Sequence, residues 1–158
     1  MALRAPARVP ATLATGAALG ALATVAMSVA MFGFKRLGLM GELPPEKITA
    51  RMLDRLHITP SGRAQHLVAR MNHIAFGALG GVVFEALRRR LPDRTPILPV
   101  ALTFAAAIWA VSYAGWAPAL GLMPSPRKDR LGRQLSMVAA HIVYGATLGV
   151  LADRIRKA

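Results

Sequence analysis

Residues 9–34 read VPATLATGAALGALATVAMSVAMFGF and contain no charged side chain. A helix rises about 1.5 Å per residue, so this stretch can cross roughly 30 Å of hydrocarbon with length to spare for tilt. Arg8 precedes it and Lys35 follows it. A basic start before an apolar run is also typical of a secretory signal, but the run is longer than a signal core of about 7 to 15 residues. We therefore predict a first membrane-spanning helix over 9–34.

The composition of the whole chain favours the same environment. Apolar residues make up 54% of the 158 positions and charged residues 17%, and the charges gather between long uncharged stretches. The formal net charge of +13 would favour nucleic acid in a soluble protein. Here the Lys and Arg residues flank the apolar stretches, where their side chains reach lipid phosphates. We expect the lipid bilayer and anionic lipid headgroups as partners, and no nucleic acid.

Three further apolar stretches predict three more spans, over 67–87, 98–119 and 134–153. The third span lies inside the uncharged run 95–126, and Pro118 is expected to kink or end it. The second and fourth spans are weaker because His73, Glu85 and His141 interrupt them. Residues 1–158 are predicted to form a single transmembrane domain.

Two pairs of segments in the chain resemble each other. Residues 73–85 (HIAFGALGGVVFE) match residues 141–153 (HIVYGATLGVLAD), and LGLM at 37–40 recurs at 120–123. A helix hairpin used twice explains both matches. Because each copy contains two spans, both copies cross in the same direction. The predicted fold class is all-α: an integral membrane four-helix bundle made of two parallel-repeat helix hairpins.

The connection between the first two spans predicts one short interfacial amphipathic helix over 45–57. Its apolar residues share one face at helical spacing, and they are Ile48, Met52, Leu53 and Leu56. The hairpin loops on the opposite side are also rich in Arg and Lys, but the basic residues near both termini and in the short central loop weigh more under the positive-inside rule and favour an orientation with both termini in the cytoplasm. These residues are Arg4, Arg8, Arg88, Arg89, Arg90, Arg94, Arg154, Arg156 and Lys157.

Small residues recur at the four-residue spacing that lets membrane helices approach closely. We predict helix packing, within the chain or between copies in a homo-oligomer, through Gly16, Gly20, Gly77, Gly81, Gly145 and Gly149. Near the far ends of the second and fourth spans, Glu85 and Asp153 each precede basic residues at helical neighbour distances. Local ion pairs are expected there.

His73 and His141 are the polar residues that say most about function. Ionisable groups inside a membrane are costly and generally face the bundle interior or a watery cavity. The two imidazoles could ligate a haem b iron, bind a metal ion, or transfer protons near neutral pH. Each could equally hydrogen-bond a neighbouring helix. We predict no metal site, because a zinc ion needs further donors and His66 is the only other candidate visible.

Sequence motifs for catalysis are missing. No nucleotide-binding loop, nucleophile elbow or HExxH motif is present. The absence of cysteine excludes disulfides, thiolate metal sites and a cysteine nucleophile. We predict that the protein is not an enzyme.

The second half of the chain combines a His-Ile-x-Phe helix ending in Glu85, the segment GLMP at 121–124, and AHIVY at 140–144. This pattern resembles the YagU-like family of bacterial inner-membrane proteins, a domain-of-unknown-function group, over residues 72–155. The resemblance implies a multi-pass protein of the bacterial inner membrane, with no established reaction or cofactor. The chain departs from the family in its shorter hairpin loops and in Met137, where the family has an acid.

These observations lead to one main functional hypothesis and two competitors. The main hypothesis is a non-enzymatic membrane protein without a cofactor that contributes to envelope integrity or stress tolerance. The alternative is a bis-histidine haem protein, or a proton- or ion-handling protein, that uses His73 and His141. A small transporter is the third possibility and would need a cavity between the two hairpins.

Overall fold

The computed structural model describes residues 9–157, and in this range it contains helices and connecting loops without a β-strand. Four helical segments are long and apolar enough to cross a membrane. They are α1 (Val9–Arg36), α3 (Gly62–Arg88), the segment from α4 (Ile97–Trp109) to α5 (Ala117–Ala119), and α6 (Leu131–Lys157). The predicted all-α four-helix membrane bundle is confirmed.

The third span is irregular near its end. Between α4 and α5 the chain forms a π-helical segment, η2 (Ala110–Trp116), in which Gly115 has φ −106° and ψ −105°. Pro118 follows within the last turn and has no N–H to donate to the helix. The predicted distortion therefore lies one turn before Pro118, where a proline disturbs the preceding carbonyls, and the helix ends at Ala119.

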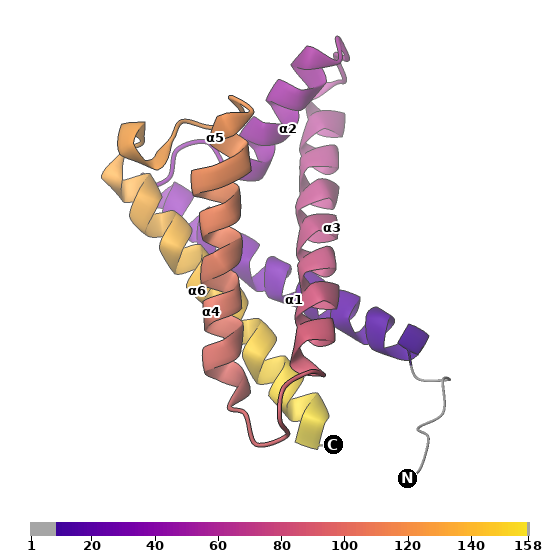
Figure 1. Cartoon of the computed structure of the whole chain (residues 1–158). Coiled ribbons are helices and arrows are strands. Elements are labelled where there is room, and N and C mark those ends of the chain that lie inside the picture. Colours follow the sequence, from indigo (N-terminus) through magenta and orange to yellow (C-terminus); the bar gives the residue numbers. More distant parts are fainter. Residues whose placement is uncertain (1–8, 158) are drawn as a thin grey trace.

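The helices pack as two hairpins joined through one contact. α1 packs against α3, α4 packs against α6, and α1 also packs against α6, whereas α3 and α4 meet at few positions. Figure 1 shows α2 (Pro44–Arg55) and α5 at one end of the bundle, and the C-terminus and the α3–α4 loop at the other. The bundle is therefore closed on three sides and loosely packed between α3 and α4.

Glycines bring α1 and α3 into backbone contact. A Cβ atom on Gly20 would collide with the backbone of Gly77 and Gly81, and one on Gly81 would collide with the backbone of Gly16 and Gly20. Membrane helices gain no hydrophobic stabilisation from one another in lipid, so close van der Waals contact of this kind holds them together.

The second hairpin uses glycine on one helix only. Cβ atoms built on Gly145 would lie 2.8 Å from the Ala105 methyl and 2.9 Å from the Ala101 carbonyl. Gly149 lies against Ala101 and Leu98 in the same way. The α4–α6 pair is therefore also packed through small residues.

The two LGLM segments end their helices with the same geometry. Gly38 and Gly121 have φ values of +74° and +64°, which favour glycine because it lacks a Cβ atom. The amide that follows each glycine, of Leu39 and of Leu122, donates to the carbonyl five residues earlier, at 3.0 and 2.8 Å. This is the Schellman pattern of helix termination.

The expected ion pairs lie at the end of the bundle opposite the two LGLM segments. Arg88 donates two hydrogen bonds to the Glu85 carboxylate, at 2.8 and 2.5 Å, and the Glu85 side chain is 5% exposed. Asp153 pairs with Arg156 at 2.6 Å and with Lys157 at 2.5 Å. Each acid is thus neutralised by its own helix where the span ends.

Replacing Gly81 with alanine should destabilise the bundle, because the new methyl group would meet the α1 backbone, which cannot move aside as a side chain would. We expect a loss of about 1–3 kcal/mol. Gly33→Ala is the matched control: no atom lies within 4 Å of a Cβ there, so a gain of about 0.5–1 kcal/mol is expected. Unfolding in mixed micelles with increasing dodecyl sulfate measures both. Equal stability of the two variants would contradict the packing role of Gly81.

Candidate functional site

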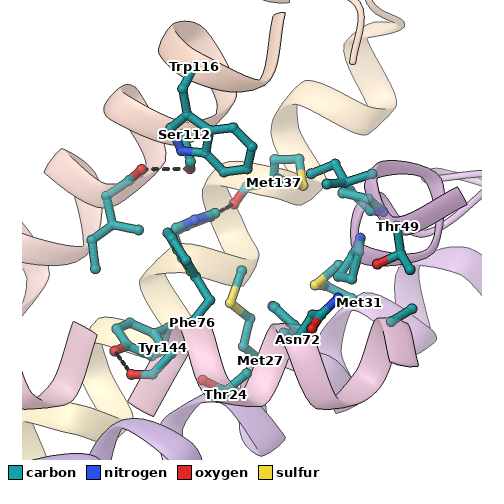
Figure 2. A pocket seen from close by; sticks show the side chains of 18 of the residues that line it. Thr24, Met27, Met31, Thr49, Asn72, Phe76, Ser112, Trp116, Met137 and Tyr144 are labelled. Atoms are coloured by element: carbon teal, nitrogen blue, oxygen red, sulfur yellow. Dashed lines mark hydrogen bonds between the residues drawn. The ribbon is translucent and has the colours of Figure 1, made fainter. Parts of the chain in front are cut away.

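A cavity of about 350 Å³ lies between the two hairpins, in the half of the bundle nearest the hairpin loops. Figure 2 shows its lining, with Met27 and Met31 of α1, Phe76 of α3, Trp116 of η2 and Met137 of α6 around a common space. Helix α2 covers one side of this space through Pro44, Pro45, Ile48, Thr49 and Met52. Most of the lining surface is apolar.

The two predicted site histidines line the same cavity. The Nδ1 atom of His73 lies 3.2 Å from the Ser28 hydroxyl oxygen. The Nδ1 atom of His141 lies 2.8 Å from the Met137 carbonyl oxygen. A carbonyl only accepts, so Nδ1 of His141 carries the proton and its Nε2 atom keeps a free lone pair. The structure therefore places both imidazoles in the lining of one cavity, and leaves His141 with a hydrogen-bond acceptor that no protein group uses.

A second buried polar group, which the sequence analysis did not identify, is the hydroxyl of Thr49. Thr49 is 3% exposed and His141 is 7% exposed. Among residues 9–157, neither the Thr49 hydroxyl nor the His141 Nε2 atom makes a hydrogen bond. Buried polar groups are nearly always hydrogen-bonded. Both groups are therefore available to a molecule in the cavity.

Three further polar side chains of the lining are engaged within the protein, whereas the Asn72 amide and the Trp116 indole N–H make no hydrogen bond among residues 9–157. The Thr24 hydroxyl donates to the Gly20 carbonyl at 2.7 Å, and the Tyr144 hydroxyl donates to the Gly77 carbonyl at 2.9 Å. The Ser112 hydroxyl donates to the Ile108 carbonyl at 2.6 Å. The lining residues include no Asp, Glu, Lys or Arg. Chemically, the cavity offers hydrogen bonds to a guest but no ionic partner.

His66, the only further metal donor suggested by the sequence, does not reach this cavity. Its Nδ1 atom lies 3.2 Å from Glu46 of α2, and its side chain is 57% exposed. In the part of the chain that the structure describes, no group of three His, Cys, Asp or Glu residues could hold a metal ion. His66 instead helps to fix α2.

Helix α2, predicted as a short interfacial helix, packs against α3 and is anchored to both hairpins. Glu46 pairs with His66 of α3 and with Lys35 at the end of α1. Arg51 and Arg55 donate hydrogen bonds of 2.6 Å to the carbonyls of Gly121 and Leu120 at the end of the third span. These contacts hold the Thr49 face of α2 over the cavity.

Removing both arginine anchors should loosen α2 without unfolding the bundle. In the double variant Arg51→Ala, Arg55→Ala we expect amide hydrogens of α2 to exchange about tenfold faster, since charge-assisted hydrogen bonds are lost. Hydrogen–deuterium exchange with mass spectrometry measures this, and α6 should keep its protection. Lys47→Ala, at a position on α2 with no ion pair among the described residues, is the control. Unchanged exchange in the double variant would show that the arginines do not anchor α2.

Comparison with known proteins gives a family without an assigned activity. No curated protein and no solved structure was found to match the chain. The resemblance to the YagU-like family therefore stays a prediction. The model of the Family of unknown function (DUF6789) matches residues 10–158, so the chain belongs to that family.

Proposed function

We propose that the chain is a non-enzymatic, multi-pass inner-membrane protein that binds a small, mainly apolar molecule in the cavity between its hairpins. The observation that carries the proposal is the cavity of about 350 Å³, lined by two buried residues, Thr49 and His141, whose hydroxyl and Nε2 atom make no hydrogen bond within the described chain. Ligand sites typically have volumes of about 300–1,000 Å³, a mostly apolar lining and a few converging polar groups. Binding of this kind would underlie the hypothesised role in envelope integrity or stress tolerance.

The chemistry of the lining favours binding over catalysis. His141 offers a neutral acceptor and Thr49 a hydroxyl, whereas the one serine in the lining, Ser112, donates to its own helix. No lining carboxylate could orient a histidine as a general base. A role in retaining or presenting a molecule fits these groups better than a reaction.

We also propose that the two hairpins arose by duplication and that both termini lie in the cytoplasm. The matching glycine terminations after α1 and α5 and the small-residue contacts within each hairpin support a duplication. The basic residues at the end of the bundle that holds Arg88 and Arg156 support a cytoplasmic location of that end. The cavity would then lie nearer the opposite side of the membrane.

Photolabelling tests the binding function. Diazirine-bearing C16 probes with a hydroxyl, a carboxylate or no headgroup are incorporated into phosphatidylcholine nanodiscs with the protein. We expect at least one probe to label Met27, Met31 or Met137 and to be displaced by excess unlabelled compound. Ser112→Phe should reduce this labelling at least fivefold, because the new ring occupies the cavity.

Val29→Phe is the control for that experiment, since Val29 is 69% exposed on α1 and lies outside the lining. This variant should label as the parent does. Size-exclusion elution and helical circular dichroism establish that both variants fold. Labelling restricted to lipid-facing positions, with no displacement by unlabelled compound, would rule out the binding function.

A bis-histidine site is the second candidate, and the hydrogen bonds of the two imidazoles favour it. In each ring Nδ1 is engaged, by Ser28 in His73 and by the Met137 carbonyl in His141. Histidine ligands usually have the second ring nitrogen fixed in this way while the other binds the metal. Haem iron or another ion between the two Nε2 atoms is the form this candidate takes.

Absorption spectra separate the two candidates. If the site holds haem, protein purified from haem-supplemented cells shows a Soret band that shifts on dithionite reduction. The band is lost in both His73→Ala and His141→Ala. Our proposal predicts the opposite result, a spectrum without haem bands in the parent protein. A Soret band that depends on both histidines would overturn it.

A further inference from the structure

A second hollow of about 310 Å³ lies between α3 and α4, on the side where these helices make few contacts. We call it the α3–α4 groove. Its lining is apolar except for Ser112, and consists of Phe76, Leu79, Gly80, Val83, Phe104, Ala107, Ile108, Val111, Ser112 and Trp116. Unlike the cavity, the groove has no histidine in its lining. It is suited to hydrocarbon.

The groove continues into the cavity. Phe76, Ile108, Ser112 and Trp116 line both hollows. The rings of Phe76 and Trp116 lie 6.3 Å apart at this junction, while Phe84 and Phe104 lie 5.4 Å apart elsewhere along the same pair of helices. Aromatic pairs thus connect α3 with α4 and η2, and between them the missing side chain of Gly80 makes room for the Tyr144 hydroxyl.

The groove is accessible from the lipid. Leu79, Val83 and Val111 line it and are 60%, 50% and 65% exposed. An exposed apolar edge on a membrane-spanning helix faces hydrocarbon. A molecule dissolved in the bilayer can therefore reach the groove laterally without crossing water.

The residues that line the cavity limit which headgroups such a molecule can carry. Because no charged side chain lines the cavity, an anionic or cationic head would be buried without a partner, which is costly. The His141 Nε2 atom requires a donor from the guest, and the Thr49 hydroxyl can accept or donate. A hydroxyl group meets both requirements, and an ester or a hydrocarbon does not.

On the basis of the proposed binding function, we infer that the ligand is a neutral lipid with a hydroxyl-bearing head, such as a long-chain alcohol or a quinol. The head lies between His141 and Thr49, and the tail passes the Phe76–Trp116 pair and lies in the α3–α4 groove. The polar groups select the head by hydrogen bonding, and the groove selects for a tail long enough to fill it.

Competition against a single photoprobe tests the head and the tail separately. The probe is diazirine-bearing 1-hexadecanol in phosphatidylcholine nanodiscs, and the signal is label on Met27, Met31 or Met137. We expect unlabelled 1-hexadecanol to displace it at a mole fraction at least tenfold lower than hexadecane, hexadecyl phosphate or 1-octanol. The first two competitors lack the neutral hydroxyl head, and the third lacks the long tail.

Three variants assign these preferences to residues. Thr49→Val and His141→Phe should each reduce the advantage of 1-hexadecanol over hexadecane at least threefold. Val83→Trp should reduce its advantage over 1-octanol, because the indole occupies the groove. Val29→Trp, the same change on a lipid-facing part of α1 outside both hollows, should leave both ratios unchanged.

The outcomes distinguish this inference from the proposed function. If all four competitors displace the probe equally, or the phosphate is best, the cavity binds lipids but the inference on the headgroup is wrong. If head selectivity persists while Val83→Trp has no effect, the inferred tail position is wrong. Disulfide cross-linking between protomers of a Val83→Cys or Val111→Cys variant would assign the groove to a second copy of the chain and also overturn it. If no compound displaces the probe, the binding function itself fails.

Discussion

The backbone contact between α1 and α3 at Gly20, Gly77 and Gly81 is the constraint on which the site depends. Two helices that touch where side chains are missing, and that cross at an angle, must separate further along their length. Figure 1 shows α1 and α3 diverging toward the end that carries α2. Met27 and Met31 follow the contact on α1 and face the widened space. The close approach therefore opens the cavity as well as holding the hairpin together.

The second hairpin, α4 and α6, is also held by a close contact through small residues. Gly145 and Gly149 bring α6 close to Ala101 and Ala105 of α4, and α6 also packs against α1. α6 is consequently central to the bundle, with nine buried residues along its length. The remaining pair, α3 and α4, is held by aromatic rings in place of glycine contacts. Longer side chains keep these two backbones apart, and the α3–α4 groove is the space that remains.

The sequence predicts well those features that depend on local patterns. Apolar runs give the four candidate spans, and His73 and His141, the ionisable groups predicted to face the interior or a cavity, line one cavity. The sequence does not predict that α3 and α4 pack loosely, because a hollow between two helices depends on pairs of side chains that are distant in sequence. Thr49 was not identified for this reason, since on its own helix it is an ordinary polar position. The π-helical segment is similarly difficult, because it depends on where the strain before Pro118 is relieved.

The distribution of charge explains why the cavity remains selective inside a strongly basic protein. Arg51 and Arg55 lie close to the cavity through α2, yet their guanidinium groups bond to the carbonyls of Gly121 and Leu120 at the end of the third span. The helix therefore turns its cations outward and presents Thr49 inward. Since a buried cation would attract the abundant anionic lipid headgroups, its exclusion from the lining leaves hydrogen bonding as the means of recognition. A neutral guest is then distinguished from bulk phospholipid by the charge that it lacks.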